Sequence, residues 1–173
     1  MIAKRKGVLK YKILINAVNI IIILLLQTTL VDYMGIKNVK PNFILVYIVC
    51  ASIMEGSVGG GWIGLFAGLT YDILCGKYLG FFALLGMYTG IIAGMANRRV
   101  HKENVIVALF FNFFLTIFYE LGVYIISNLG QRITNILYVF RNILLVEALY
   151  NTGLSIIVHI LVVRIYRKLN LSK

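Results

Sequence analysis

Long apolar runs, separated by short polar or basic segments, dominate the chain. Runs of roughly 17–25 residues have the length of membrane-spanning helices, whereas barrel strands alternate apolar and polar positions over roughly ten residues. The pattern therefore predicts an all-α polytopic membrane protein, with six transmembrane helices in a single transmembrane domain that covers residues 1–173. The expected helices cover residues 13–31, 41–54, 60–74, 80–96, 104–127 and 144–163.

Residues 131–142 follow a different pattern. Apolar residues recur there at helical spacing, while Arg132, Asn135 and Arg141 fall elsewhere. This pattern fits an interfacial helix that lies along the membrane surface, and it fits equally well a plain loop before the last helix. The sequence leaves both alternatives open.

Glycines repeat at steps of four in the third and fourth expected helices. This spacing places them on one helix face, so that a neighbouring helix can approach backbone to backbone. We expect the two helices to pack on each other through Gly60, Gly64, Gly68, Gly86, Gly90 and Gly94. The same step continues to Asp72, Gly76 and Gly80, which form a candidate partner-binding group. The alternative for Asp72 is a carboxylate that caps a loop or pairs with Lys77.

Composition and charge narrow the class of protein. The chain is 61% hydrophobic and 13% charged, with a mean hydropathy of +0.92, which excludes an ordinary soluble domain. The net charge of +11 is spread over segment ends and short loops, which argues against nucleic-acid binding. With the N-terminus inside, twelve lysines and arginines fall on the inner side and five on the outer side. The positive-inside rule therefore favours cytoplasmic N- and C-termini.

Charged groups inside a bilayer are costly, so each is a candidate for function. Glu120 lies in the fifth expected helix, with Asn112 and Thr116 eight and four residues before it. These residues form an intramembrane polar stripe that must face protein. Structural hydrogen bonding is one explanation for the stripe, and a proton or ligand site, as in a proton-coupled carrier, is the other.

No pattern indicates catalysis, a cofactor or a metal site. The two cysteines, Cys50 and Cys75, form no C-x-x-C pair and no ligand cluster. Glu147 and His159 lie in one expected helix, but twelve residues separate them by about 18 Å, too far for a catalytic dyad. The motifs of zinc proteases, hydrolases and P-loop proteins are absent from the sequence. We therefore expect a protein that is not an enzyme.

Three features together resemble the rod shape-determining protein MreD family. They are a Pro-Asn pair at the start of the second expected helix, the run G-x-x-x-G-x-x-x-G-L-x-x-D from Gly60 to Asp72, and Leu79-Gly80-x-x-Ala83-Leu84 after it. The chain length, the six expected spans and the short basic tail are similar as well.

The resemblance implies a non-catalytic membrane component of the bacterial cell elongation machinery, located in the cytoplasmic membrane. It implies that the protein scaffolds or regulates peptidoglycan synthesis through MreC, its most direct expected partner. Further expected partners are the actin-like MreB, a RodA-type glycosyltransferase, a class B penicillin-binding protein and membrane lipid.

The alternative function is a substrate-binding subunit of an energy-coupling-factor vitamin transporter, a family to which MreD proteins have been likened in fold. Such subunits often carry an A-x-x-x-A face in the first helix for docking their coupling partner. Here Ala17 is followed four residues later by Ile21, so this signature is absent.

Overall fold

The computed structural model describes residues 2–29, 35, 39–75, 79–98, 101–127 and 140–171. Within these residues the chain forms six α-helices and two short helical turns. The helices are α1 (Ile2–Thr29), α2 (Phe43–Glu55), α3 (Ser57–Cys75), α4 (Phe81–Met95), α5 (Val105–Ser127) and α7 (Leu145–Leu171); the turns are η1 (Ala96–Arg98) and η2 (Phe140–Leu144).

The two terminal helices are longer than the hydrophobic pattern predicts. α1 begins at Ile2 rather than at residue 13, and α7 ends at Leu171 rather than at residue 163. Lysine and arginine favour helices almost as much as leucine does, so the helices continue into basic segments that an apolar criterion leaves out. Most of the expected interfacial helix, residues 131–139, lies outside the described residues, and residues 140–142 belong to η2, a single π-helical turn.

Three of the described helices are long and apolar enough to cross a membrane: Tyr11–Thr29, Val105–Ile126 and Leu145–Lys168. α2 and α4 are apolar but have only 13 and 15 residues. Helix length and composition thus support an all-helical membrane protein with at least these spans.

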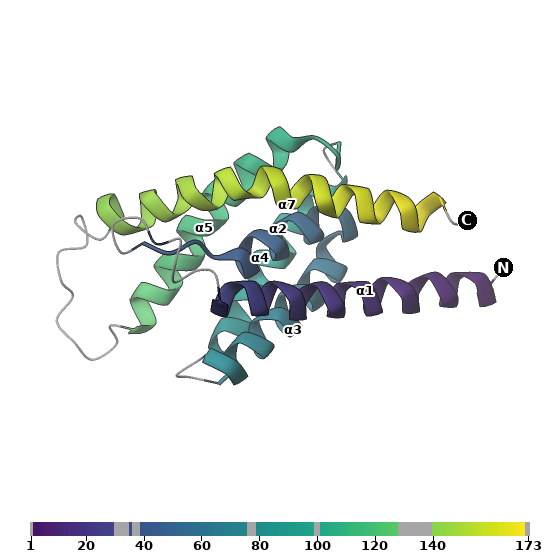
Figure 1. Ribbon diagram of the computed structural model, residues 1–173, viewed down its shortest axis with the longest axis horizontal. Helices are drawn as coiled ribbons and strands as arrows, with labels where there is room; N and C mark the ends of the chain where they lie inside the picture. The colour runs from purple at the N-terminus through teal and green to yellow at the C-terminus, as the bar shows by residue number, and fades with distance from the viewer. Residues whose placement is uncertain are drawn as a thin grey trace.

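The short helix α2 lies at the centre of the bundle, with the other helices around it (Figure 1). Every residue from Ile44 to Ile53 is buried, so the helix has no solvent-facing or lipid-facing side. A helix that is hydrophobic all round is typical of such a core position. Asparagines close both of its ends: Asn42 Oδ1 accepts from Leu45 N at 3.0 Å, and Asn97 Nδ2 donates to the carbonyl of Ile53 at 2.8 Å.

Both chain termini lie at the same end of the molecule, where the first turns of α1 and the last turns of α7 project beyond the rest of the bundle (Figure 1). We call this the terminal end; it also holds Glu55 at the end of α2 and Asn97 in η1. The opposite, distal end holds the start of α2, the end of α5 and the start of α7.

Candidate functional site

Helices α3 and α4 pack backbone against backbone along their whole length. The facing residues are Gly60 with Gly90, Gly64 with Gly86, Gly68 with Ala83, and Gly94 with Ser57. A Cβ atom added at Gly64 would lie 2.5 Å from the carbonyl carbon of Gly86, a separation that real Cβ atoms do not reach. The structure therefore brings together all six glycines of the predicted packing face, and side chains larger than hydrogen do not fit there.

Asp72 connects these two helices at the distal end of α3. Its Oδ2 accepts hydrogen bonds from the backbone N–H groups of Gly80 and Ala83, each at 3.0 Å, and its Oδ1 accepts one from Phe82 at 3.1 Å. These donors belong to the first turn of α4, whose N–H groups have no partner within the helix. The carboxylate thus caps α4 from the preceding helix and lies at the positive end of its dipole.

Gly80 makes this cap possible. Its φ of +91° lies in the left-handed region, which residues with a side chain rarely adopt. The chain can therefore turn back after α3 and direct the N–H groups of Gly80, Phe82 and Ala83 toward Asp72. The glycine is needed here for its backbone conformation rather than for close packing, because a Cβ atom at this position would meet nothing within 4 Å.

The sequence suggests that a partner contacts Asp72 directly, whereas the structure buries this side chain inside the protein. Its side chain is only 2% exposed, and backbone donors occupy both of its oxygens. The alternative reading, a carboxylate that caps a loop, describes the observed geometry. Of the other two residues in the candidate partner-binding group, Gly80 lies in the capped turn and Gly76 lies outside the described residues.

A second polar cluster lies at the distal end, where α5 and α7 meet the start of α2. The carboxyl groups of Glu120 and Glu147 are hydrogen-bonded to each other. Asn42 is hydrogen-bonded to Glu120, and Asn151 to Glu147. The side chain of Asn151 also accepts from the backbone N–H of Asn42 at 2.8 Å, which connects α7 to the start of α2.

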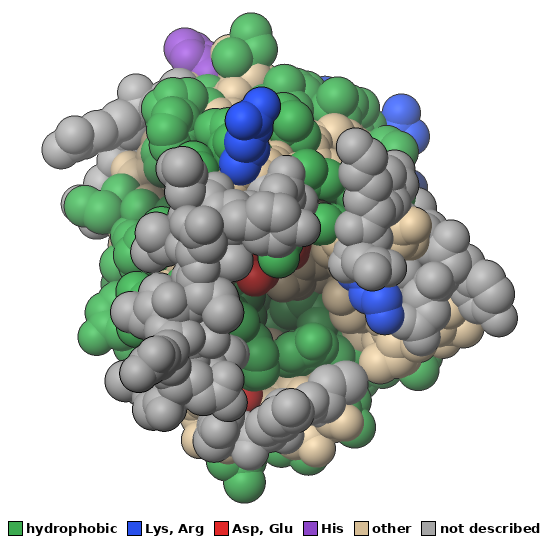
Figure 2. Space-filling model, turned by 90° about the vertical axis from the view of Figure 1, so that its left-hand side faces the viewer, with side chains coloured by type: hydrophobic (Ala, Val, Ile, Leu, Met, Phe, Trp, Pro, Cys, Tyr) green, Lys and Arg blue, Asp and Glu red, His purple; other side chains and the backbone are tan. Residues whose placement is uncertain are grey.

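Two buried carboxyl groups thus lie side by side in this cluster, and neighbouring carboxyl groups repel each other when both are ionised. Figure 2, which views the distal end, shows acidic side chains (red) beside a hollow lined by hydrophobic side chains (green). Among the described residues, the acidic side chains in the distal halves of their helices are Asp72, Glu120 and Glu147.

The predicted polar stripe on α5 continues inward from this pair. Thr116 Oγ1 accepts from Asn151 Nδ2 at 3.4 Å, and Asn112 Nδ2 donates to the carbonyl of Ala108 at 2.9 Å. Asn112 also lies 3.7 Å from the sulfur of the buried Cys50. Asn112 and Thr116 are fully buried, so the stripe faces protein and joins α5 to α2 and α7.

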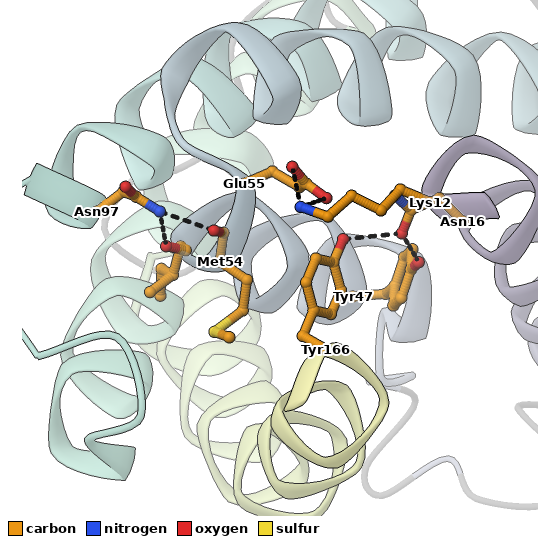
Figure 3. A network of polar contacts seen from close by, with 8 residues as sticks. Lys12, Asn16, Tyr47, Met54, Glu55, Asn97 and Tyr166 are labelled. Atoms are coloured by element: carbon orange, nitrogen blue, oxygen red, sulfur yellow. Dashed lines mark hydrogen bonds and ion pairs between the residues drawn. The ribbon is translucent and has the colours of Figure 1, made fainter. Parts of the chain in front are cut away.

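At the terminal end, a third network ties α1 to the bundle (Figure 3). Lys12 forms an ion pair with Glu55 at 3.1 Å, and its ammonium lies 5.4 Å from the centre of the Tyr166 ring. Asn16 Oδ1 accepts from the hydroxyl groups of Tyr47, at 2.7 Å, and Tyr166, at 3.1 Å. Sequence reasoning missed this network, because its members come from three helices separated by up to 150 residues.

The three polar networks hold helices together, and none has the arrangement of a known catalytic centre. In the part of the chain that the structure describes, no three His, Cys, Asp or Glu side chains lie close enough together to hold a metal ion. His159 is fully buried within α7, twelve residues from Glu147 on the same helix.

The family model of rod shape-determining protein MreD matches residues 8–169, nearly the whole chain. The chain belongs to the MreD family. No curated protein and no solved structure matches it. The likeness to transporter subunits therefore stays a prediction.

Membership of the MreD family assigns the chain to the determination of rod shape in cells. The three apolar helices agree with the membrane location of such a protein. In this chain, the glycines of the motif allow α4 to pack closely on α3, and Asp72 caps the N-terminus of α4. The glycines and the aspartate of the motif in this chain thus belong to one closely packed helix pair.

Proposed function

We propose that this MreD protein is a non-catalytic, six-span scaffold in the cytoplasmic membrane, with both termini in the cytoplasm, and that it supports peptidoglycan synthesis during cell elongation by binding MreC. MreB, a RodA-type glycosyltransferase and a class B penicillin-binding protein would then join the assembly, directly or through MreC. The proposal rests on family membership and on one structural observation, the rigid α3–α4 pair.

Six spans are compatible with the short helices. α2 has only 13 residues, about 20 Å of helix, against a hydrocarbon layer of about 30 Å. Non-helical backbone at membrane depth is tolerated where protein surrounds it. Here α2 is buried among the other helices, and asparagine side chains close both of its ends, which supplies that protection.

The α3–α4 pair offers a surface for a partner at its distal end. Ile73 and Leu74 in the last turn of α3 and Leu79 before α4 are largely exposed, Leu79 to 80%. Asp72 directly precedes Ile73 and binds the backbone N–H of Gly80, which follows Leu79, so it fixes the turn that presents these residues although it is itself buried. With the proposed orientation, these residues reach the outer surface of the membrane, where MreC has its bulk. We therefore place the MreC contact on the apolar residues and give Asp72 a positioning role.

The test is co-purification of MreC with variants of this turn. Leu79→Ala should lower the recovery of MreC severalfold and give rounded cells, while the amount of MreD in the membrane stays unchanged. Leu149→Ala is the matched control, because Leu149 is an exposed leucine on α7, outside the α3–α4 pair. Normal MreC recovery and normal rods in Leu79→Ala and in Ile73→Ala would refute this contact.

A further inference from the structure

One face of α7 changes from apolar to basic along its length. Ile157, Leu161, Arg164 and Lys168 follow one another at intervals of four, three and four residues, which places them on a single helix face. All four side chains are exposed, Ile157 to 62% and Leu161 to 51%. We call this set the α7 stripe.

The basic residues of the α7 stripe are not neutralised by the acids at the terminal end. Glu55 is engaged by Lys12, and Glu103 receives the guanidinium of Arg167. Arg167 lies three residues from Arg164 and is paired with Glu103. In the described part of the chain, Arg164 and Lys168 therefore have no acidic partner and present two positive charges one helical turn apart.

The depth of these residues matches the structure of a bilayer. The apolar part of α7 runs from Leu145 to Lys168, 24 residues or about 36 Å of helix. A hydrocarbon layer of about 30 Å that begins at the distal end of this segment would end close to Arg164. Leu161 and Ile157 would then lie within the acyl chains, and Arg164 and Lys168 at the level of the phosphate groups.

We propose that the α7 stripe is a binding site for an anionic phospholipid. The phosphate lies between Arg164 and Lys168, whose donors suit phosphate oxygens, and an acyl chain lies along Leu161 and Ile157. A partner with an acidic protein surface would use the two charges but would leave the apolar half of the stripe unexplained. A phospholipid has both parts in this order along the membrane normal. This site goes beyond the proposed scaffold role and does not depend on it.

The site can be tested with a tryptophan reporter in reconstituted full-length protein. The chain has a single tryptophan, so Trp62→Phe removes the background signal, and Leu161→Trp places a reporter in the stripe. Brominated phosphatidylglycerol and brominated phosphatidylcholine then compete for the position beside it. We expect phosphatidylglycerol to quench the tryptophan at a lower mole fraction than phosphatidylcholine. The difference should be about fivefold for each of the two charges, because each basic residue near an anionic surface contributes about 1 kcal/mol to lipid binding.

Replacing the two charges distinguishes the site from general attraction to anionic lipid. Arg164→Gln with Lys168→Gln should abolish the preference, whereas Arg141→Gln, an exposed arginine at the distal end, should leave it unchanged. If Leu161→Trp does not fold, Ile157→Trp serves as the reporter on the same face. Equal quenching by the two lipids would overturn the proposal, and charge-dependent binding of an acidic peptide such as polyglutamate in its place would assign the stripe to a protein partner.

Discussion

At the residue scale, Asp72 illustrates how one carboxylate can define a turn. An N-cap side chain usually precedes the helix it caps by one position, but Asp72 reaches α4 from eight residues before Gly80. It accepts hydrogen bonds from three backbone N–H groups that membrane lipid cannot satisfy. An N–H group without an acceptor in an apolar medium lowers the stability of the fold. The aspartate in the family motif is thus explained by the backbone of the next helix.

Replacing this residue should have a graded effect. Asp72→Ala leaves three N–H groups, one buried and two part-buried, without an acceptor and should lower the free energy of unfolding by about 3 kcal/mol, at about 1 kcal/mol for each group. Asp72→Asn keeps one oxygen and should cost less, about 1–2 kcal/mol. Unfolding in detergent by added denaturing surfactant, followed by circular dichroism, measures both. Stabilities equal to that of the natural chain would refute the cap.

A second residue-scale prediction concerns the exposed ion pair between α7 and the segment before α5. The Arg167 guanidinium, which hydrogen-bonds to Glu103, holds the pKa of that carboxyl below its usual range. The pKa is therefore lower in the folded chain than in the unfolded one. The resulting stabilisation is present above the ordinary carboxyl pKa of about 4.3 and is lost as the pH falls through the folded-state pKa.

Arg167→Gln should raise the pKa of Glu103 to its ordinary range. Carbon NMR of the labelled carboxyl during an acid titration measures this shift directly. Arg164→Gln serves as the control, because Arg167 rather than Arg164 forms the ion pair with Glu103, and it should leave the titration of Glu103 nearly unchanged. An unchanged pKa in Arg167→Gln would show that the ion pair does not form in solution.

At the element scale, the α3–α4 pair was predictable because its information is local. Glycines at steps of four define a helix face without reference to the rest of the chain, and two consecutive helices with such faces have few other ways to pack. The polar contacts were harder to predict. Glu120 and Glu147 meet only because α5 and α7 are held in one relative register, which no single helix specifies. The contact of Asp72 with α4 depends on a turn that contains Gly80 in the left-handed conformation. The spacing of the glycines along the sequence does not indicate that conformation.

The close approach of α3 and α4 gives a sharp mutational contrast. Gly64→Ala adds a methyl group where the backbone of Gly86 already lies, so the helices must separate, and overpacking of this kind costs about 1–3 kcal/mol. Gly153→Ala is the matched control on α7, because its added methyl group meets nothing within 4 Å. It should be neutral or stabilising by up to about 1 kcal/mol, since alanine favours helix. Equal effects of the two changes on surfactant unfolding would contradict the backbone contact.

At the scale of the whole molecule, the bundle has one helix at its centre and polar networks at both ends. The other helices surround α2. The Lys12–Glu55 network connects helices at the terminal end, and the Glu120–Glu147 cluster connects helices at the distal end. The sequence predicted the class and the approximate helices from hydrophobic run length. It did not predict that the shortest helix is the core, because burial on all sides and lipid exposure on all sides produce the same apolar composition.

The orientation of this bundle in the membrane is the last prediction, and it follows from charge. Twelve lysines and arginines fall at the terminal end in the six-span arrangement and five at the distal end, so the terminal end should face the cytoplasm. In a background with Cys50→Ala and Cys75→Ala, a membrane-impermeant maleimide should label Arg141→Cys in intact cells. It should label His101→Cys only after the membrane is opened, because that exposed position belongs to the terminal end. Labelling of both positions from outside would contradict a single membrane crossing by α5 between them, and the reversed pattern would contradict the orientation on which the proposed MreC contact depends.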